Sequence, residues 1–200
     1  MAAAATIFAS GVDTDVLKFQ TLSGELTVSK KGDRLEMVLP VWQLEPRMAL
    51  IEQVGQCVGV KPLEFHWLGE GCRDGMAVFD SAQQIVDMMP DLQRLRDLPC
   101  PALICTAPGP APDVACDFVY RFFAPRMGVD EDPATGSAQC SLIPYWTQKL
   151  GKTSLVSIQL SKRRAELYGE LQQGEDSKEQ KVMVSGTTVT VIKGEILVPV

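Results

Sequence analysis

Apolar and polar positions alternate over several short stretches of the chain, as they do in strands that bury one face. Residues 16–22 follow this pattern, and residues 26–28 and 35–39 flank Lys30-Lys31-Gly32-Asp33, which predicts a β-hairpin. Prolines bracket residues 40–46, which are expected to form a linker. Further strands are expected where short apolar runs lie between turn residues, at 63–68, 76–79, 102–106, 115–123, 156–160, 166–171, 181–185, 188–192 and 196–198.

Helical spacing occurs in fewer places. Residues 2–9 are rich in alanine and stop before a glycine, which predicts a short helix, and residues 47–58 carry apolar side chains three or four positions apart. Ser81 is expected to cap a helical region that runs to about Leu98 and is interrupted at Pro90.

One further helix is expected from Gly136 to about Leu150. It is apolar on nearly all sides, which is typical of a buried helix, although Pro144 lies inside it. Helices that interleave with mostly antiparallel strand signals favour an α+β fold over a doubly wound parallel sheet.

Composition narrows the classes of function. The chain has 200 residues, 46% of them hydrophobic and 22% charged, which is ordinary for a globular protein. Its net charge of −6 disfavours nucleic acid as a partner, and the densest basic run, Lys162-Arg163-Arg164, is short. No apolar run approaches about 18 residues, so no membrane span is expected.

The six cysteines are scattered and form no Cys-x-x-Cys pair, and the chain has one histidine. A zinc site is therefore not supported, and no metal is expected. Single cysteines of this kind are typical of a reducing compartment, so we predict a cytoplasmic protein.

The stretch with the most chemical content is Glu131-Asp132-Pro133-Ala134-Thr135-Gly136-Ser137, a loop that leads into the last helix. Asp132, Thr135 and Ser137 could each cap that helix. The amides of its first turn have no partner within the helix, so they could bind an anion, and Gly136 would let a ligand approach the backbone. Asp132 would then lie near a substrate, and its carboxylate could move a proton if burial adjusts its pKa. On spacing alone, a capped helix without a ligand is the more common interpretation.

Several stretches of the sequence carry a family resemblance, at residues 21–26, 117–125, 131–138, 144–146, 150–152, 159–161 and 184–194. On these stretches the chain resembles the phenazine-biosynthesis-like (PhzF) isomerases, which are related in fold to diaminopimelate epimerase. The resemblance implies two pseudo-symmetric halves, each a curved, mainly antiparallel sheet around a central helix. Residues 1–45 would be the remnant of an incomplete first half and residues 46–200 the second half, whose last strand would return to the first.

The resemblance also implies roles for residues. Asp132 would be catalytic, and Thr135, Gly136 and Ser137 would bind a small carboxylate substrate. Thr135 stands where the related epimerases have a catalytic cysteine, which disfavours a two-cysteine racemase mechanism, and Cys140 is interpreted as a core residue. The family needs no cofactor, and its members suggest a homodimer.

The sequence departs from the family pattern in three ways. The family's catalytic glutamate, its Gly-Asn-Pro segment and its Gly-His-Ala motif would lie upstream of Met1, so residues 2–9 would be the remnant of the first central helix. The family's Ser-x-Arg-Gly-Gly is replaced by residues 161–165, which lack both glycines, and this puts the turn geometry there in question. Gln139 stands where relatives often have histidine.

Two hypotheses about function follow. The first is a cofactor-independent isomerase that moves a proton on a small carboxylate. The second is a non-catalytic relative that binds a small anion or another protein, and a fragment that folds poorly and aggregates is a third possibility. Other polar residues have structural interpretations: His66 as a packed or surface side chain, Glu25 at a strand edge, and Arg121 in an ion pair.

Overall fold

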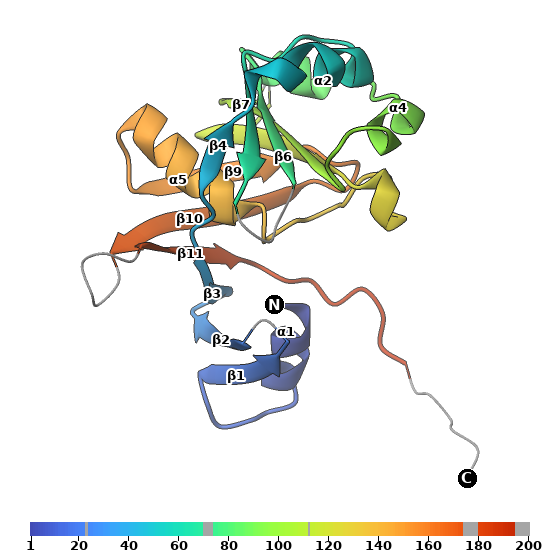
Figure 1. Cartoon of the computed structure of the whole chain (residues 1–200). Helices are drawn as coiled ribbons and strands as arrows, with labels where there is room; N and C mark the ends of the chain where they lie inside the picture. Colours follow the sequence, from blue (N-terminus) through green and yellow to red (C-terminus); the bar gives the residue numbers. More distant parts are fainter. Residues whose placement is uncertain (23, 70–73, 112, 174–179, 195–200) are drawn as a thin grey trace. The chain divides into compact units, whose positions relative to one another are not determined.

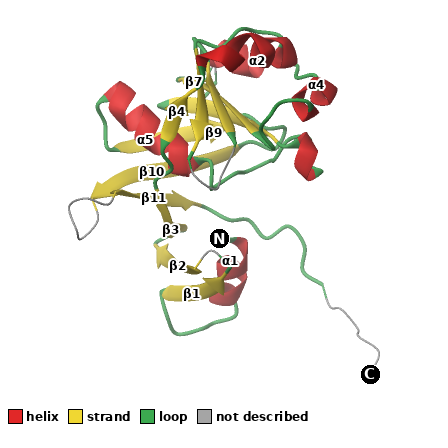
Figure 2. Ribbon diagram, in the orientation of Figure 1, coloured by secondary structure: helices red, strands yellow, loops and turns green. Residues whose placement is uncertain are grey.

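The computed structural model describes residues 1–22, 24–69, 74–111, 113–173 and 180–194. Contacts divide the chain into two compact units, Met1–Met37 with Ser185–Val200, and Val38–Val184. The borders of these units differ from the boundary between residues 45 and 46 that the family resemblance implies. The division into two family halves stays a prediction. The expected α+β class is confirmed, because strands and a few short helices make up both units (Figure 2).

The smaller unit is a helix on a β-hairpin. Helix α1 (Ala2–Ala9) precedes strands β1 (Val16–Thr21), β2 (Gly24–Lys31) and β3 (Arg34–Pro40), which crosses into the larger unit. Strand β2 pairs antiparallel with both neighbours, as the alternating pattern predicts. Ala4 of α1 packs against Val28 and Leu35 and forms a small core with them.

The predicted strand at residues 188–192 is wrong, because these residues have no regular structure. Val189, Val191 and Ile192 are each more than four-fifths exposed. Alternation of side chains describes what a strand would bury, and it says nothing about whether a neighbouring strand is present. The strand expected at 196–198 lies outside the described residues.

The larger unit is built on a mixed sheet, in the strand order β11-β10-β9-β8-β7-β6-β5-β4. The pairs β6–β7 and β8–β9 are parallel, whereas β4–β5, β5–β6, β7–β8 and β9–β10 are antiparallel. The strand bounds are β4 Leu44–Pro46, β5 Glu64–Leu68, β6 Gly75–Val78, β7 Leu103–Pro108, β8 Phe118–Phe123, β9 Ser154–Gln159, β10 Ala165–Gln173 and β11 Gln180–Gly186.

Strand β4 lies where a linker was expected. It has three residues, ends at Pro46 and pairs with β5 alone, at the end of the sheet. Proline is tolerated in edge strands, where the missing N–H faces away from the sheet. A three-residue edge strand of this kind leaves no periodic signal in the sequence.

Helices cover both faces of this sheet. On one face lie a one-turn 3₁₀ helix (Met48–Leu50) that leads into α2 (Ile51–Val58), then α3 (Ala82–Val86) and α4 (Leu92–Arg96), all near β6 to β8. Alternate residues of β7, such as Leu103 and Cys105, join their apolar core. On the other face α5 (Gln139–Leu150) packs along β9 and β10 (Figure 1). The interruption expected at Pro90 is confirmed, and Asp91 caps α4 by accepting from two backbone amides.

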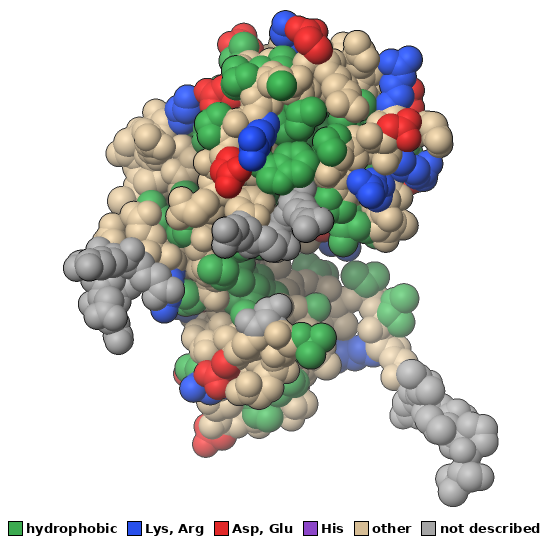
Figure 3. All heavy atoms as spheres, viewed as in Figure 1, with side chains coloured by type: hydrophobic (Ala, Val, Ile, Leu, Met, Phe, Trp, Pro, Cys, Tyr) green, Lys and Arg blue, Asp and Glu red, His purple; other side chains and the backbone are tan. Residues whose placement is uncertain are grey.

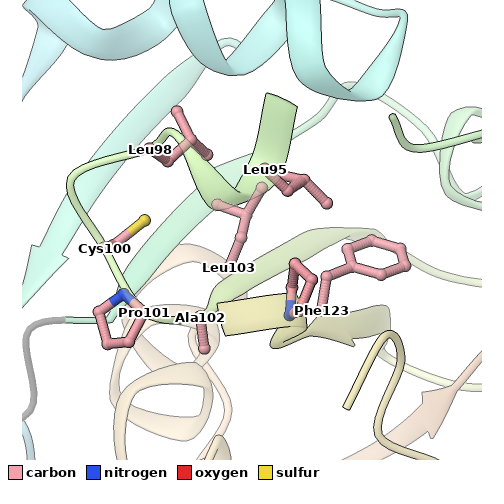
Figure 4. Close-up of a pocket in the computed structure, with 8 residues that line it drawn as sticks. Leu95, Leu98, Cys100, Pro101, Ala102, Leu103 and Phe123 are labelled. Carbon is pink, nitrogen blue, oxygen red and sulfur yellow. The ribbon is translucent and has the colours of Figure 1, made fainter. Parts of the chain in front are cut away.

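A small apolar hollow lies beneath α4 (Figure 4). It is lined by Leu95, Leu98, Cys100, Pro101, Ala102, Leu103, Phe123 and Pro125. Burial raises the pKa of the Cys100 thiol to about 12, and Asp74 adds to the effect. The hollow therefore belongs to the packing of α4 on the sheet rather than to a reactive site.

The first half of α5 is buried, as its composition predicts, and Pro144 lies inside it. A proline donates no backbone hydrogen bond, so the carbonyl of Cys140, four residues earlier, has no partner within the helix. The amide of Trp42 donates to that carbonyl at 2.9 Å. The segment between β3 and β4 is thereby attached to the helix.

Surface charge, membrane-spanning helices and cysteine pairing can each be compared with the expectations from composition. On the face drawn in Figure 3, Lys and Arg side chains lie interspersed with Asp and Glu. Within the described part of the chain no helix is long and apolar enough to cross a membrane. Five cysteines are described, and all are free thiols: Cys57, Cys100, Cys105, Cys116 and Cys140.

Candidate functional site

The loop that contains Glu131 to Ser137 connects β8 to α5, and it follows a one-turn 3₁₀ helix at Pro125–Met127. The amide of Asp132 donates to the carbonyl of Phe122 in β8 at 2.9 Å, which ties the loop to the end of that strand. The predicted position of the loop, in front of the buried helix, is confirmed.

Helix α5 begins later than expected. Its first residue is Gln139, its N-cap is Ala138, and no side chain caps it. The expected caps at Asp132, Thr135 and Ser137 are therefore wrong. The reason is that the Thr135 hydroxyl donates instead to Oδ2 of Asp132, so these two side chains satisfy each other. Thr135 is buried, and Asp132 is partly exposed.

The amides before the helix remain available. The first bonds of this turn are donated by Gln139, to Gly136, and by Cys140, to Ser137. Among the described residues no acceptor is found for the amides of Gly136 and Ser137. A Cβ added at Gly136 would meet nothing within 4 Å, so the space above that backbone is open. Such amides at the start of a twelve-residue helix can bind an anionic group.

Gln159, the last residue of β9, is hydrogen-bonded to the loop, and the sequence analysis did not identify it as a site residue. Its Oε1 accepts from the Thr135 amide at 2.6 Å. Its Nε2 donates to the carbonyl of Asp132 and, at 3.3 Å, to the Thr135 hydroxyl. The side chain is fully buried. The available signal was an amide side chain at the end of a strand expected to be buried, because such a group needs buried partners.

A second buried group lies beside Gln159 on β8. Tyr120 is its register partner, and the Tyr120 hydroxyl donates to the carbonyl of Thr135 at 3.1 Å. Burial raises the pKa of the Tyr120 phenol, Gln139 opposes the shift, and Asp132 adds to it. Tyr120 therefore acts as a hydrogen-bond donor rather than as a base. Gln139 itself is fully buried, and neither polar atom of its side chain makes a hydrogen bond of normal geometry within the described structure.

The turn that lacks the family glycines also contacts the loop. The Ser161 hydroxyl donates to the carbonyl of Pro133 at 2.8 Å. Arg164 takes the left-handed conformation, with φ of 57°, and its side chain pairs with Asp113. A residue with a Cβ thus takes a left-handed conformation in this turn, at a cost of about 1–2 kcal/mol.

Arg121 forms an ion pair, as expected. Its Nε and Nη2 bind the two oxygens of Glu131 at 2.7 and 3.0 Å, and its Nη1 donates to the carbonyl of Met88 at 2.7 Å. The guanidinium also lies 4.8 Å from the ring centre of Phe123. Arg121 therefore anchors Glu131, the residue that precedes Asp132, to the face of the sheet that α3 covers.

The side chains of His66 and Glu25 have hydrogen-bond partners outside the loop. His66 is buried on β5, with its Nε2 2.9 Å from Oε2 of Glu64, and that carboxylate also accepts from Tyr145 and Lys149 of α5. The described residues contain no group of three or more side chains suited to a metal ion. The packed interpretation of His66 is confirmed. Glu25 is exposed near the start of β2 and pairs with Lys18.

Chemically, the loop offers a partly exposed carboxylate at Asp132 and, four and five positions later, two amides with no acceptor among the described residues. Asp132 has one oxygen occupied by Thr135 and a second oxygen without a hydrogen bond to any described residue. Four side chains, Arg121, Tyr120, Gln159 and Ser161, brace the loop from neighbouring strands and turns. Such bracing is what a site for orienting a small ligand requires.

Comparison with known proteins gives a consistent picture. The family model described as "Phenazine biosynthesis-like protein" matches residues 1–194. An uncharacterized isomerase of Pseudomonas aeruginosa is 39% identical over 181 residues, which are 90% of this chain and 64% of the relative. The mouse phenazine biosynthesis-like domain-containing protein 2 is 30% identical, over 98% of this chain and 70% of its own. The chain thus spans just under two thirds of the first of these relatives.

Solved structures agree with these relatives. A putative PhzC/PhzF protein from Clostridium difficile has a TM-score of 0.79 and 33% identity, and the match covers 98% of this chain and 71% of that one. A PhzF-family protein from Enterococcus faecalis has the same TM-score with 30% identity, over 93% of this chain and 66% of that one. With its sequence, its fold and its Glu-Asp-Pro-Ala-Thr-Gly-Ser loop in agreement, the chain belongs to the phenazine biosynthesis-like (PhzF) family.

Proposed function

We propose that the protein is a cofactor-independent isomerase that moves a proton on a small carboxylate substrate. The observation that carries this proposal is that one loop presents an oxygen of the Asp132 carboxylate and the amides of Gly136 and Ser137, none of which has a hydrogen-bond partner among the described residues. The amides would bind the substrate carboxylate, and Asp132 would face the adjacent reacting carbon or hydroxyl. The isomerase names of the bacterial relatives support the reaction class.

The division of labour follows from the hydrogen bonds. The Thr135 hydroxyl donates to Oδ2 of Asp132, so that oxygen is already occupied. The other oxygen is then the group that accepts a proton from the substrate or returns it. The open space at Gly136 lets the substrate carboxylate reach the backbone, and the exposed hydroxyl of Ser137 can donate a further hydrogen bond.

Exchange of substrate hydrogen with solvent tests the proposal. The protein is incubated in D₂O with a panel of small carboxylic acids that carry an acidic C–H next to a double bond, and deuterium uptake is followed by ¹H NMR. Uptake is expected for at least one compound and is expected to be abolished by Asp132→Asn. Asp130→Asn is the matched control, since Asp130 lies two positions away, is exposed and, among the described residues, has an ion pair with Arg96 alone, at 3.5 Å. Undiminished exchange in Asp132→Asn would refute the role of Asp132.

A second candidate is a protein that binds a small anion without turning it over. It is favoured by the fact that the neighbouring carboxylate, Glu131, is already bound by Arg121 and so does not act beside Asp132 as a second acid or base. Binding of acetate at the Gly136 amide without deuterium uptake from any compound would support this candidate over the isomerase.

A further inference from the structure

The side chain of Gln159 can face the loop in one way only. Its Oε1 accepts from the Thr135 amide at 2.6 Å, and an N–H group can only donate. The amide end of the side chain is therefore fixed with its nitrogen toward the carbonyl of Asp132, an atom that can only accept. Two backbone groups of opposite polarity thus decide the orientation of Gln159.

This orientation determines the direction of the next hydrogen bond. Nε2 of Gln159 also donates to the Thr135 hydroxyl oxygen at 3.3 Å. A hydroxyl that accepts from a neighbour still has one proton to donate, and the remaining partner is Oδ2 of Asp132. The Asp132 carboxylate therefore receives a donor rather than facing a second acceptor.

The surroundings leave this network little freedom. Gln159 is fully buried, and Thr135 is 6% exposed. The carbonyl of Thr135 is held by the Tyr120 hydroxyl, and the carbonyl of Pro133 by Ser161. The neighbouring Leu160 amide donates to the Tyr120 carbonyl at 2.8 Å, which continues the parallel pairing of β8 and β9 up to this point. A buried network whose inner members are all hydrogen-bonded favours one arrangement.

We propose that Gln159 is a positioning residue that fixes the Thr135 hydroxyl as a donor to Oδ2 of Asp132, and so holds that carboxylate with its second oxygen free for substrate. The proposal rests on the proposed function for its meaning in catalysis. Its physical content, the coupling from Gln159 through Thr135 to Asp132, can be measured without any substrate.

The substitution Gln159→Met tests the coupling, since methionine has a similar length and neither donates nor accepts as the amide does. Without Gln159 the Thr135 hydroxyl loses the donor that directs its proton toward Asp132. Protonation of Asp132 is followed through its carboxyl carbon by ¹³C NMR as a function of pH. In Gln159→Met the signal is expected to move at a pH higher by roughly 0.5–1 unit, a threefold to tenfold change in the protonation equilibrium.

The same substitution in a Thr135→Val background separates positioning from a general structural effect. Valine has no hydroxyl to orient, so Gln159→Met is expected to leave the Asp132 titration of that background unchanged. Equal shifts in both backgrounds, or no shift in either, would overturn the proposal. Ser157→Ala is the control on the same strand, because the Ser157 hydroxyl bonds to the Leu167 carbonyl and does not touch the loop.

A second variant covers the case in which Gln159→Met does not fold. In Gln159→Glu the carboxylate accepts from both the amide and the hydroxyl of Thr135, and it adds a negative charge, so the upward shift is expected to exceed one pH unit. An unchanged titration in folded Gln159→Glu would equally overturn the proposal. Failure of acetate to bind at Gly136 in the unsubstituted chain would instead count against the proposed function alone.

Discussion

The substitution Gly136→Ala separates ligand binding from stability more cleanly than any other change in the loop. The added methyl group would enter open space, since no atom lies within 4 Å of the position of its Cβ. Gly136 does not have a positive φ, so alanine causes no backbone strain there. The methyl group would, however, occupy the volume through which an anion reaches the amides of residues 136 and 137.

The magnitudes of the two effects follow from this geometry. Loss of glycine where the backbone is compatible changes the free energy of unfolding by about 0.4–1 kcal/mol, in the stabilising direction. Loss of one charge-assisted hydrogen bond from an amide to a carboxylate costs about 1.5–3 kcal/mol of binding free energy. This corresponds to an affinity that is roughly tenfold to 150-fold lower.

Both quantities can be measured on the same samples. Urea unfolding gives the stability, and titration with sodium acetate, followed by the ¹H–¹⁵N signal of residue 136, gives the affinity. In the unsubstituted chain this signal is expected to move with acetate concentration. In Gly136→Ala the midpoint of unfolding is expected to stay or rise, while the acetate response falls at least tenfold.

Gly194→Ala is the matched control, because its added Cβ also meets nothing within 4 Å and it lies outside the loop. Acetate binding is expected to be unchanged in that variant. If Gly136→Ala bound acetate as well as the control, the amides of the loop would not form the anion site. If Gly136→Ala unfolded at a markedly lower urea concentration, the space at this position would not be open.

Three further predictions concern the scaffold. Gly169→Ala is expected to lower the free energy of unfolding by about 1–3 kcal/mol, because its Cβ would collide with the side chain of Ile143, and Ile143→Val should recover part of the loss in urea unfolding. Arg121→Met is expected to cost about 2–4 kcal/mol by leaving Glu131 partly buried and unpaired, and adding Glu131→Gln should reduce that cost; an equal loss in the double variant would refute the ion-pair argument. Burial acts to raise the pKa of Glu64, but hydrogen bonds from Lys149, His66 and Tyr145 outweigh it and hold that pKa below its usual value. The stability that these bonds contribute is therefore present above about pH 4.5 and is lost as the pH falls further. The free energy of unfolding, measured from pH 7 to pH 3, should depend less steeply on pH in Glu64→Gln.

Local patterns in the sequence predict much of this fold. The alternation around Lys30 to Asp33 predicts the hairpin of β2 and β3, and the apolar helix after Gly136 is buried as expected. Both predictions succeed because burial of one face or of a whole helix dictates the residue types directly.

The predictions from sequence that the structure contradicts are wrong for two physical reasons. Residues 44–46 and 188–192 were misjudged because pairing depends on the presence of a neighbouring strand, which no local pattern encodes. The start of α5 was misjudged because Asp132 and Thr135 can bond either to the helix or to each other, and the tertiary contact from Gln159 favours the second.

For the candidate site, the family motif led to residues 132, 135, 136 and 137, and the structure brings the first two into direct contact. The supports, Tyr120 and Gln159, come from two strands separated by 30 residues along the chain. They become neighbours only through the parallel pairing of β8 and β9, so no spacing rule could have joined them.

Pro144 suggests a more general use of proline in buried helices. A helix normally uses all its interior carbonyls itself, and its backbone then offers nothing to other segments. In α5 the proline releases the carbonyl of Cys140, and Trp42, nearly a hundred residues earlier, binds it. Replacing Pro144 by alanine would therefore exchange one backbone bond for another, because the new amide would compete with Trp42 for the same oxygen. In this protein the proline specifies an attachment point, four residues upstream, for a distant part of the chain.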